Sequence, residues 1–291
     1  MCDLDTLEEN NEFLRKSGQI SRRQFNTLTA GATLAMMLPA VANAQDVVES
    51  DVMIETPDGV ADCYFVHPAS GKHPAVIMWP DILGLRPAFR EMGKRLAQSG
   101  YSVLVVHPFY RSAPSPVVPE GASFGDPEIR NLVLPMAQAL NAETHVTDAR
   151  TFVAWVDQQA AVDTNRKIGT MGYCMGGPIV MRTAAALPER IGAGGSFHGG
   201  GLVTDSRDSP HLGIPTMDAH MLIAVADNDD ERDPETKHAL RAAFEAANVP
   251  AEVEVYEGAM HGWCVIDSTV YHEEQAERAW GRMLAIFESA L

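Results

Sequence analysis

The chain has 291 residues, of which 46% are hydrophobic and 21% charged, and its formal net charge is −17. These proportions are typical of a globular protein that is long enough to bury a sizeable core. An acidic surface repels phosphate backbones and anionic lipids, and no basic cluster interrupts it. The composition therefore argues against binding to nucleic acid or to a membrane surface.

The first 44 residues resemble a twin-arginine export signal. Residues 1–20 are polar, and we expect them to be disordered. Ser-Arg-Arg-Gln-Phe-Asn follows at 21–26, then a weakly apolar run that ends in Ala-Asn-Ala at 42–44. Paired arginines, an apolar run and an A-x-A cleavage site occur in the order of such a signal. Glycine, threonines and Pro39 make the run a poor spanning helix, so we expect no stable membrane anchor.

This signal predicts that residues 1–44 are a leader recognised by the twin-arginine export machinery. Residues 45–291 would then be one domain that is periplasmic or secreted from a bacterium and crosses the membrane already folded.

Strands and helices are expected to alternate after residue 45. Residues 52–55 and 61–66 predict an antiparallel hairpin around a Pro-Asp-Gly turn. Apolar runs predict further strands at 74–79, 101–106, 191–197, 221–226 and 251–256, and one that leads into the glycine motif described next. Helical periodicity covers 87–98, a stretch from Asn141 or Thr144 to Ala161, a segment ending near 186, then 234–247 and 270–290. This alternation predicts a parallel sheet with helices on both faces.

Two long irregular segments interrupt that alternation. Residues 107–141 are rich in proline and glycine, and residues 199–213 are rich in glycine. A long irregular stretch inside a compact domain is usually functional, so we expect the first to be a cap or substrate loop.

Gly-Tyr-Cys-Met-Gly at 172–176 has the spacing of a nucleophile elbow, with cysteine in the place where serine is usual. A strand that turns directly into a helix crowds the backbone, which explains the two glycines. Cys174 would stand at the turn, where a helix N-terminus favours a thiolate. The alternative is a buried structural cysteine beside a glycine turn.

A cysteine nucleophile needs a base, and the base needs an orienting acid. In α/β-hydrolases these follow the nucleophile in the order acid, then base. His261 follows an expected strand and is flanked by Gly258 and Gly262, so it is the candidate base. The candidate acid lies in Asp-Asn-Asp-Asp at 227–230, where three aspartates compete.

The chain has four cysteines, and the three after the leader are Cys63, Cys174 and Cys264. An odd number leaves at least one free thiol. No Cys or His spacing indicates zinc, and the expected chemistry needs no metal or organic cofactor. We interpret Cys264 as a packing residue.

Residues 46–291 resemble the dienelactone hydrolase family. The motifs that carry the resemblance are Gly-Tyr-Cys-Met-Gly-Gly at 172–177, Ser-Phe-His-Gly-Gly-Gly at 196–201 and Tyr-Glu-Gly-Ala-Met-His-Gly at 256–262. The resemblance implies an α/β-hydrolase fold with a mostly parallel central sheet. It also implies a Cys-Asp-His triad that cleaves a small ester or lactone through a cysteine acyl-enzyme.

The resemblance assigns further roles. Asp229 best matches the triad acid, with Asp227 as the alternative. The backbone amides of Met175 and Ile82 would form the oxyanion hole. Asp81 replaces a glutamate that contacts the resting thiol in the family, but it is one methylene shorter and could instead cap its loop.

The substrate contacts follow the family less closely. Its well-studied lactonases hold a substrate carboxylate with arginines, yet no arginine follows His261 closely. Arg111 and Arg130 could supply this contact or be ordinary surface residues. Tyr110 is a candidate pocket wall, and His198 is expected at the rim of the site. Trp79 and Trp263 are also candidate pocket walls, or simply core residues.

Two other functions remain open at this stage. The first is a general esterase or thioesterase, which the export signal favours because ring degradation through lactones is normally cytoplasmic. The second is a non-catalytic ligand-binding or thiol-redox protein on the same fold. A redox role would require a partner cysteine near Cys174.

Overall fold

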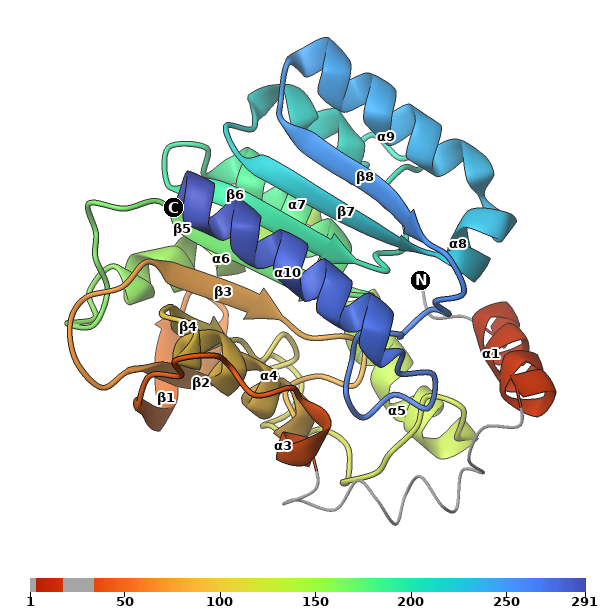
Figure 1. Ribbon diagram of the computed structural model, residues 1–291, viewed down its shortest axis with the longest axis horizontal. Coiled ribbons are helices and arrows are strands. Elements are labelled where there is room, and N and C mark those ends of the chain that lie inside the picture. The colour runs from red at the N-terminus through yellow and green to blue at the C-terminus, as the bar shows by residue number, and fades with distance from the viewer. Residues whose placement is uncertain (1–3, 18–33) are drawn as a thin grey trace.

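The computed structural model describes residues 4–17 and 34–291 of the chain. Eight strands form one sheet in the order β1-β2-β4-β3-β5-β6-β7-β8 (Figure 1). β2 is antiparallel to β1 and β4, and every other pair is parallel. The strands are β1 (Val47–Thr56), β2 (Gly59–Pro68), β3 (Ala75–Trp79), β4 (Ser102–Val105), β5 (Ile168–Tyr173), β6 (Ile191–Phe197), β7 (His220–Ala226) and β8 (Ala251–Tyr256).

Helices cover both faces of this sheet, as predicted. α4 (Pro87–Gln98) and α10 (Glu273–Ala290) contribute to the apolar core on one face. α6 (Ala142–Val156), α7 (Gly176–Ala186) and α9 (Pro234–Ala247) contribute to the core on the other. In α4, Phe89, Met92 and Leu96 recur at helical spacing and are buried together. The predicted arrangement of a mostly parallel sheet between two helical layers is confirmed.

Several helices in the described part of the chain were not expected from the sequence. α5 (Pro127–Gln138) lies in the segment predicted to be irregular, and its internal Pro135 obscures the helical pattern. α8 (Asp227–Arg232) follows β7 directly. α1 (Leu4–Ser17) lies in the stretch predicted to be disordered, where that prediction is wrong for the described residues.

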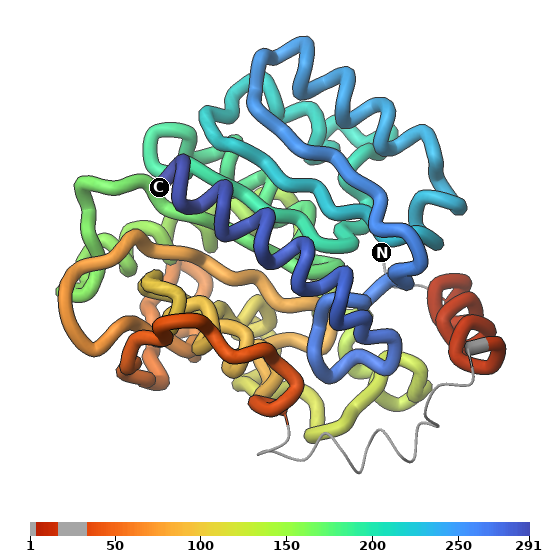
Figure 2. The backbone as a smooth tube through the Cα atoms, viewed as in Figure 1, coloured from red at the N-terminus to blue at the C-terminus, as the bar shows by residue number. Residues whose placement is uncertain are grey.

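The N-terminal region therefore holds more structure than its composition suggests. Figure 2 shows α1 at the edge of the molecule where β7 and β8 end. A short helix, α3 (Leu34–Met37), packs Leu34 into the core beside α4. Arg22 and Arg23 of the predicted export motif lie outside the described residues. No helix in the described part of the chain is both long and apolar enough to span a bilayer.

The glycine-rich segment that follows β6 is also partly regular. A 3-10 helix, η2 (Pro210–Thr216), occupies its end, and Ile214 is buried in the core on the α7 face. This segment leads into the amino end of β7.

Candidate active site

Cys174 stands at a sharp turn between β5 and α7. Its backbone has φ 52°, a left-handed conformation that is uncommon for a residue with a side chain. A Cβ atom on Gly172 would lie 2.5 Å from the Gly176 carbonyl oxygen, and one on Gly176 would lie 2.5 Å from the Trp79 carbonyl oxygen. Both positions therefore require glycine, as the elbow motif predicted.

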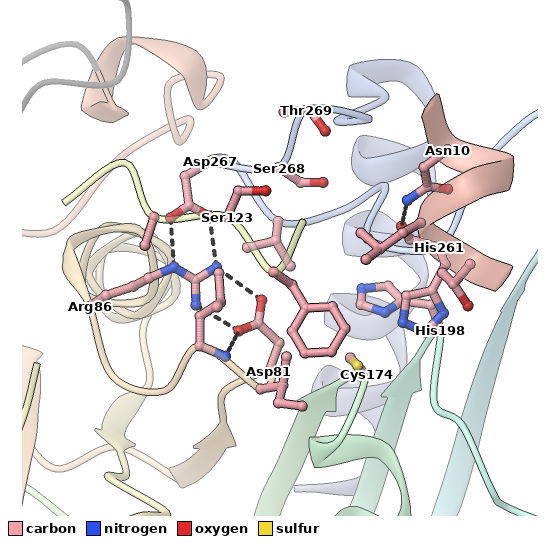
Figure 3. A pocket seen from close by; sticks show the side chains of 18 of the residues that line it. Asn10, Asp81, Arg86, Ser123, Cys174, His198, His261, Asp267, Ser268 and Thr269 are labelled. Atoms are coloured by element: carbon pink, nitrogen blue, oxygen red, sulfur yellow. Dashed lines mark hydrogen bonds and ion pairs between the residues drawn. The ribbon is translucent and has the colours of Figure 1, made fainter. Parts of the chain in front are cut away.

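The thiol of Cys174 faces a cavity of about 120 Å³ at the carboxyl ends of the parallel strands (Figure 3). Ligand sites of α/β folds usually occupy this position. The walls come from four segments and from His198: α1 (Thr6, Leu7, Asn10), the loop after β3 (Asp81–Leu83, Arg86), residues 121–124, and, after β8, His261, Gly262, Val265 and Asp267–Thr269.

His261 connects Cys174 to an acid. Its Nδ1 lies 2.6 Å from Oδ2 of Asp229, and its ring also makes a hydrogen bond with Cys174. Asp227 instead accepts a hydrogen bond from the Gly258 amide at 2.7 Å and so fixes the loop. The structure thus brings Asp229, rather than Asp227, to the histidine, because α8 turns Asp229 toward it.

The charges of this group are strongly coupled. Burial disfavours a charged imidazole, but the Asp229 carboxylate and Cys174 outweigh it and raise the pKa of His261 to about 10. Burial alone would raise the pKa of Asp229, yet attraction to His261 lowers it. An ionised Asp229 beside a protonated His261 is therefore the favoured state near neutral pH.

His198 is the second histidine at the thiol. It follows β6 with φ 39° and is 1% exposed. Both ring nitrogens are buried without a hydrogen bond of standard geometry, although Cys174 lies close enough to act on the ring. Burial lowers the pKa of His198, so this imidazole stays neutral. His198 lines the cavity, and the sequence analysis expected it at the rim of the site.

Asp81 also lines the cavity, but Arg86 engages it. Its Oδ1 and Oδ2 accept hydrogen bonds from Arg86 Nη1 (2.7 Å) and Nη2 (2.9 Å), and Oδ1 also accepts one from the Leu83 amide (2.9 Å). On its other edge Arg86 donates to both oxygens of Asp267 at 2.6 and 2.8 Å. Asp81 therefore holds its loop in place, the alternative role considered from the sequence.

The predicted oxyanion amides belong to two segments that meet at the elbow. Met175 is the residue that precedes α7, and Ile82 lines the cavity. A Cβ atom on Gly176 would lie 3.1 Å from the Pro80 carbonyl oxygen, so the loop that carries Ile82 is pressed against the start of α7.

Comparison with known proteins agrees with this architecture. The family model for the dienelactone hydrolase family matches residues 61–291. The chain belongs to the dienelactone hydrolase family. It is a hydrolase of the dienelactone hydrolase type with the α/β-hydrolase fold, and the resemblance inferred from its motifs is confirmed.

Individual relatives are distant but span most of the chain. A carboxymethylenebutenolidase from Rhodococcus opacus is 25% identical over 232 residues, which is 78% of this chain and 86% of the relative. A Klebsiella pneumoniae structure provisionally named a dienelactone hydrolase has a TM-score of 0.72 at 24% identity and covers 84% of this chain and 99% of its own. A dienelactone hydrolase from Anabaena variabilis has a TM-score of 0.61 at 15% identity and covers 84% of this chain and 99% of its own.

Two predicted substrate contacts lie elsewhere in this dienelactone hydrolase fold. Arg111 donates to both oxygens of Asp148, at 2.6 and 2.9 Å, and also pairs with Asp58. The Tyr110 hydroxyl donates to Asp148 and accepts from Thr56. Neither residue lines the cavity that contains the thiol, so the prediction that they contact substrate is wrong. Asp148 is buried and holds both of them instead.

The tryptophans are core residues. Trp263 is fully buried and stacks on Tyr256 with ring centroids 4.7 Å apart, which corrects its prediction as a pocket wall. Trp79 donates its indole N–H to Thr170 in the core. Arg130, the other candidate arginine, donates to the Phe124 carbonyl oxygen and does not line the cavity.

The described cysteines and acids indicate no second reactive centre. Cys63, Cys174 and Cys264 are buried and are not in disulfides, and of these only Cys174 lines the cavity. Among residues 4–17 and 34–291, no group of three or more His, Cys, Asp or Glu is placed to hold a metal ion.

Sequence reasoning missed Arg86, Asp267 and the α1 residues. An arginine that pairs across 181 positions leaves no periodic signal. The spacing of Thr6, Leu7 and Asn10 on one helical face was the available sign that residues 4–17 could pack against the domain.

Proposed function

We propose that the protein hydrolyses a small ester or lactone with Cys174 as nucleophile, His261 as base and acid, and Asp229 as the orienting carboxylate. The observation that carries the proposal is the contact of 2.6 Å between His261 Nδ1 and Asp229, on a ring that also bonds to Cys174. Such a relay prepares a thiolate and an imidazolium for acyl transfer.

In the first half-reaction, the thiolate attacks the carbonyl carbon, and the carbonyl electron pair moves onto oxygen. The amides of Met175 and Ile82 are the donors that we assign to this oxyanion. Collapse of the intermediate breaks the bond to the leaving oxygen, which takes the proton of His261. The product is a thioester on Cys174.

In the second half-reaction, neutral His261 takes a proton from water as the water oxygen attacks the thioester. Collapse of this intermediate releases the carboxylic acid and returns Cys174 as thiolate. Asp229 stabilises the imidazolium that forms. It also accepts a hydrogen bond from the Nδ1 proton, which fixes the tautomer and the orientation of the ring.

A neutral acyl group fits this cavity better than an anionic one. Among the described residues that line it, Arg86 is the one lysine or arginine, and Asp81 and Asp267 together outweigh its charge. A carboxylate on the substrate would have to compete for the cations of this site, because Arg86 is already paired with both aspartates and His261 with Asp229. This observation favours the second candidate within the same chemistry, a general carboxylesterase or thioesterase.

We also propose that the twin-arginine export machinery carries the protein to the periplasm or beyond. The support is the order of the paired arginines, apolar run and Ala-Asn-Ala site in residues 21–44. Replacing Arg22 and Arg23 by lysine should retain the protein in the cytoplasm. Cell fractionation with an antibody to the folded domain tests this, and unchanged export of the variant would reject it.

Hydrolysis assays test the catalytic proposal. The full chain and a chain that begins at Gln45 are each compared with Cys174→Ala on a dienelactone, short p-nitrophenyl esters and thioesters. Turnover that is lost in the variant supports a cysteine acyl-enzyme, and the ranking of substrates separates a lactonase from an esterase. Lack of turnover by either reduced protein would favour a binding or redox role instead.

A further inference from the structure

The helix α1 lies directly over the candidate active site. Asn10 donates its side-chain amide to the carbonyl oxygen of His261 at 3.0 Å (Figure 3). Thr6 and Leu7 join Asn10 in lining the cavity that contains Cys174. The helix therefore contacts the backbone of the candidate base and forms one wall of its pocket.

A second set of contacts ties α1 to α8. Glu9 accepts a hydrogen bond from Asn228 at 2.6 Å and pairs with Arg232 at 2.5 Å. Arg232 also donates to the Thr6 hydroxyl at 2.9 Å. Asn228 in turn accepts the His261 backbone amide at 2.8 Å, so the same side chain contacts both α1 and the histidine loop.

The helix has a bound face and a free face. Thr6 is 2% exposed, and Leu7 packs against the apolar cluster that contains Ile82 and Phe124. Leu4 is 62% exposed, and Glu8 is exposed as well. Residues 6, 7 and 10 share one face at helical spacing, as expected of a helix that docks on a surface.

We propose that the rim formed by α8, the His261 loop and the Ile82 cluster is a docking surface for α1, and that docked α1 restricts access to Cys174. The partner is a segment of this chain that precedes the predicted export motif. Cleavage after Ala44 would remove α1 with the leader and uncover the pocket. The effect on hydrolysis rests on the proposed function, but the docking itself does not.

The test measures access to the thiol in the full chain, without turnover. Iodoacetamide alkylates Cys174 at neutral pH, and mass spectrometry of its peptide gives the rate separately from Cys2. The variant Leu7→Asn/Glu9→Lys removes the apolar contact and places like charges at Arg232. Its matched control is Leu4→Asn/Glu8→Lys, with the same changes at two exposed positions of the same helix.

Undocking should raise the alkylation rate of Cys174 by about tenfold or more if the docked state dominates, whereas the control should stay within about twofold of the wild type. Equal rates in the two double variants would overturn the proposal. If the first variant misfolds, Asn10→Ala against Asn11→Ala makes the same comparison, because only Asn10 contacts His261.

Failure of the two proposals can be told apart. Faster alkylation of the undocked variant, with no hydrolysis of any ester by any form, would support docking and reject the proposed activity. Hydrolysis that depends on Cys174, with alkylation rates unaffected by the α1 substitutions, would support the activity and reject docking.

Discussion

The rings of His198 and His261 meet nearly edge to face, with centroids 4.8 Å apart and an angle of 63° between their planes. Cys174 interacts with both rings. The two imidazoles differ in charge, because Asp229 raises the pKa of His261 whereas burial lowers the pKa of His198. His261 is therefore the ring that carries an extra proton near neutral pH, whereas His198 is neutral.

His198 has no hydrogen bond of standard geometry in this structure, but its neutral ring is placed to donate one to Cys174 when the thiol ionises. Replacing His198 by alanine should lower kcat/KM about 10- to 100-fold, the loss expected when a hydrogen bond to a charged group is removed. His198→Asn keeps a donor and tolerates a positive φ, so it should recover part of the activity. Equal activity of the alanine variant and the wild type, both folded by circular dichroism, would contradict this role.

The pH dependence of thiol reactivity should depend on Asp229. Asp229→Asn removes the main attraction that raises the pKa of His261, so less imidazolium is present to hold the thiolate. Alkylation of Cys174 at pH 7 should slow by about tenfold, and the difference should shrink toward pH 10, where an unpaired thiol ionises unaided. Asp227→Asn is the matched control and should leave the profile unchanged. Parallel profiles for Asp229→Asn and wild type would count against the ion pair.

The same histidine should make stability depend on pH. The pKa of His261 is raised to about 10 in the folded state, so its contribution is fully present below its unfolded pKa of about 6.5 and is lost as pH rises through 10. The difference in the free energy of unfolding between wild type and His261→Gln should therefore be larger at pH 6 than at pH 10. Urea denaturation at the two pH values measures it, and a difference that grows with pH would show the opposite linkage.

The sequence was most informative where a pattern is local. α4, α9 and β8 begin and end where the hydrophobic period predicted, because one buried face determines each of them. The elbow at Cys174 was recognisable because contacts between neighbouring turns of chain leave no room for side chains at its two glycines.

Long-range side-chain contacts could not be predicted in this way. The choice of Asp229 over Asp227 depends on the short helix α8, which the sequence did not reveal. Tyr110 and Arg111 follow a strand that ends at the correct edge of the sheet, but buried Asp148 draws both side chains away from the cavity. A strand position predicts the edge and not the direction of each side chain.

The ion pairs of Arg111 should serve stability and not substrate binding. Arg111→Met removes hydrogen bonds to the buried carboxylate of Asp148 and should lower the free energy of unfolding by about 1.5–3 kcal/mol. KM for neutral esters should stay within about twofold of the wild type. Arg130→Met should change stability by less than about 0.5 kcal/mol. A large rise in KM for Arg111→Met with unchanged stability would restore the substrate role.

Arg86, which directly precedes α4, should contribute more to stability than Arg90 on that helix. It is 7% exposed between Asp81 and Asp267, and these carboxylates overcome the effect of burial to raise the pKa of its guanidinium. Arg86→Met would leave two carboxylates facing each other without a cation, a change that typically costs about 3–5 kcal/mol. Thermal and urea unfolding measure the loss.

Arg90 provides the matched control for that prediction. It lies on α4 and pairs with Asp51, whose side chain is 76% exposed, so the pair is largely solvated. Arg90→Met should therefore cost about 0–1 kcal/mol. A triple variant, Arg86→Met/Asp81→Asn/Asp267→Asn, leaves no unpaired carboxylate at this site. It should therefore recover much of the stability lost in Arg86→Met alone. Similar losses for Arg86→Met and Arg90→Met would show that the Arg86 cluster contributes no more than a surface ion pair.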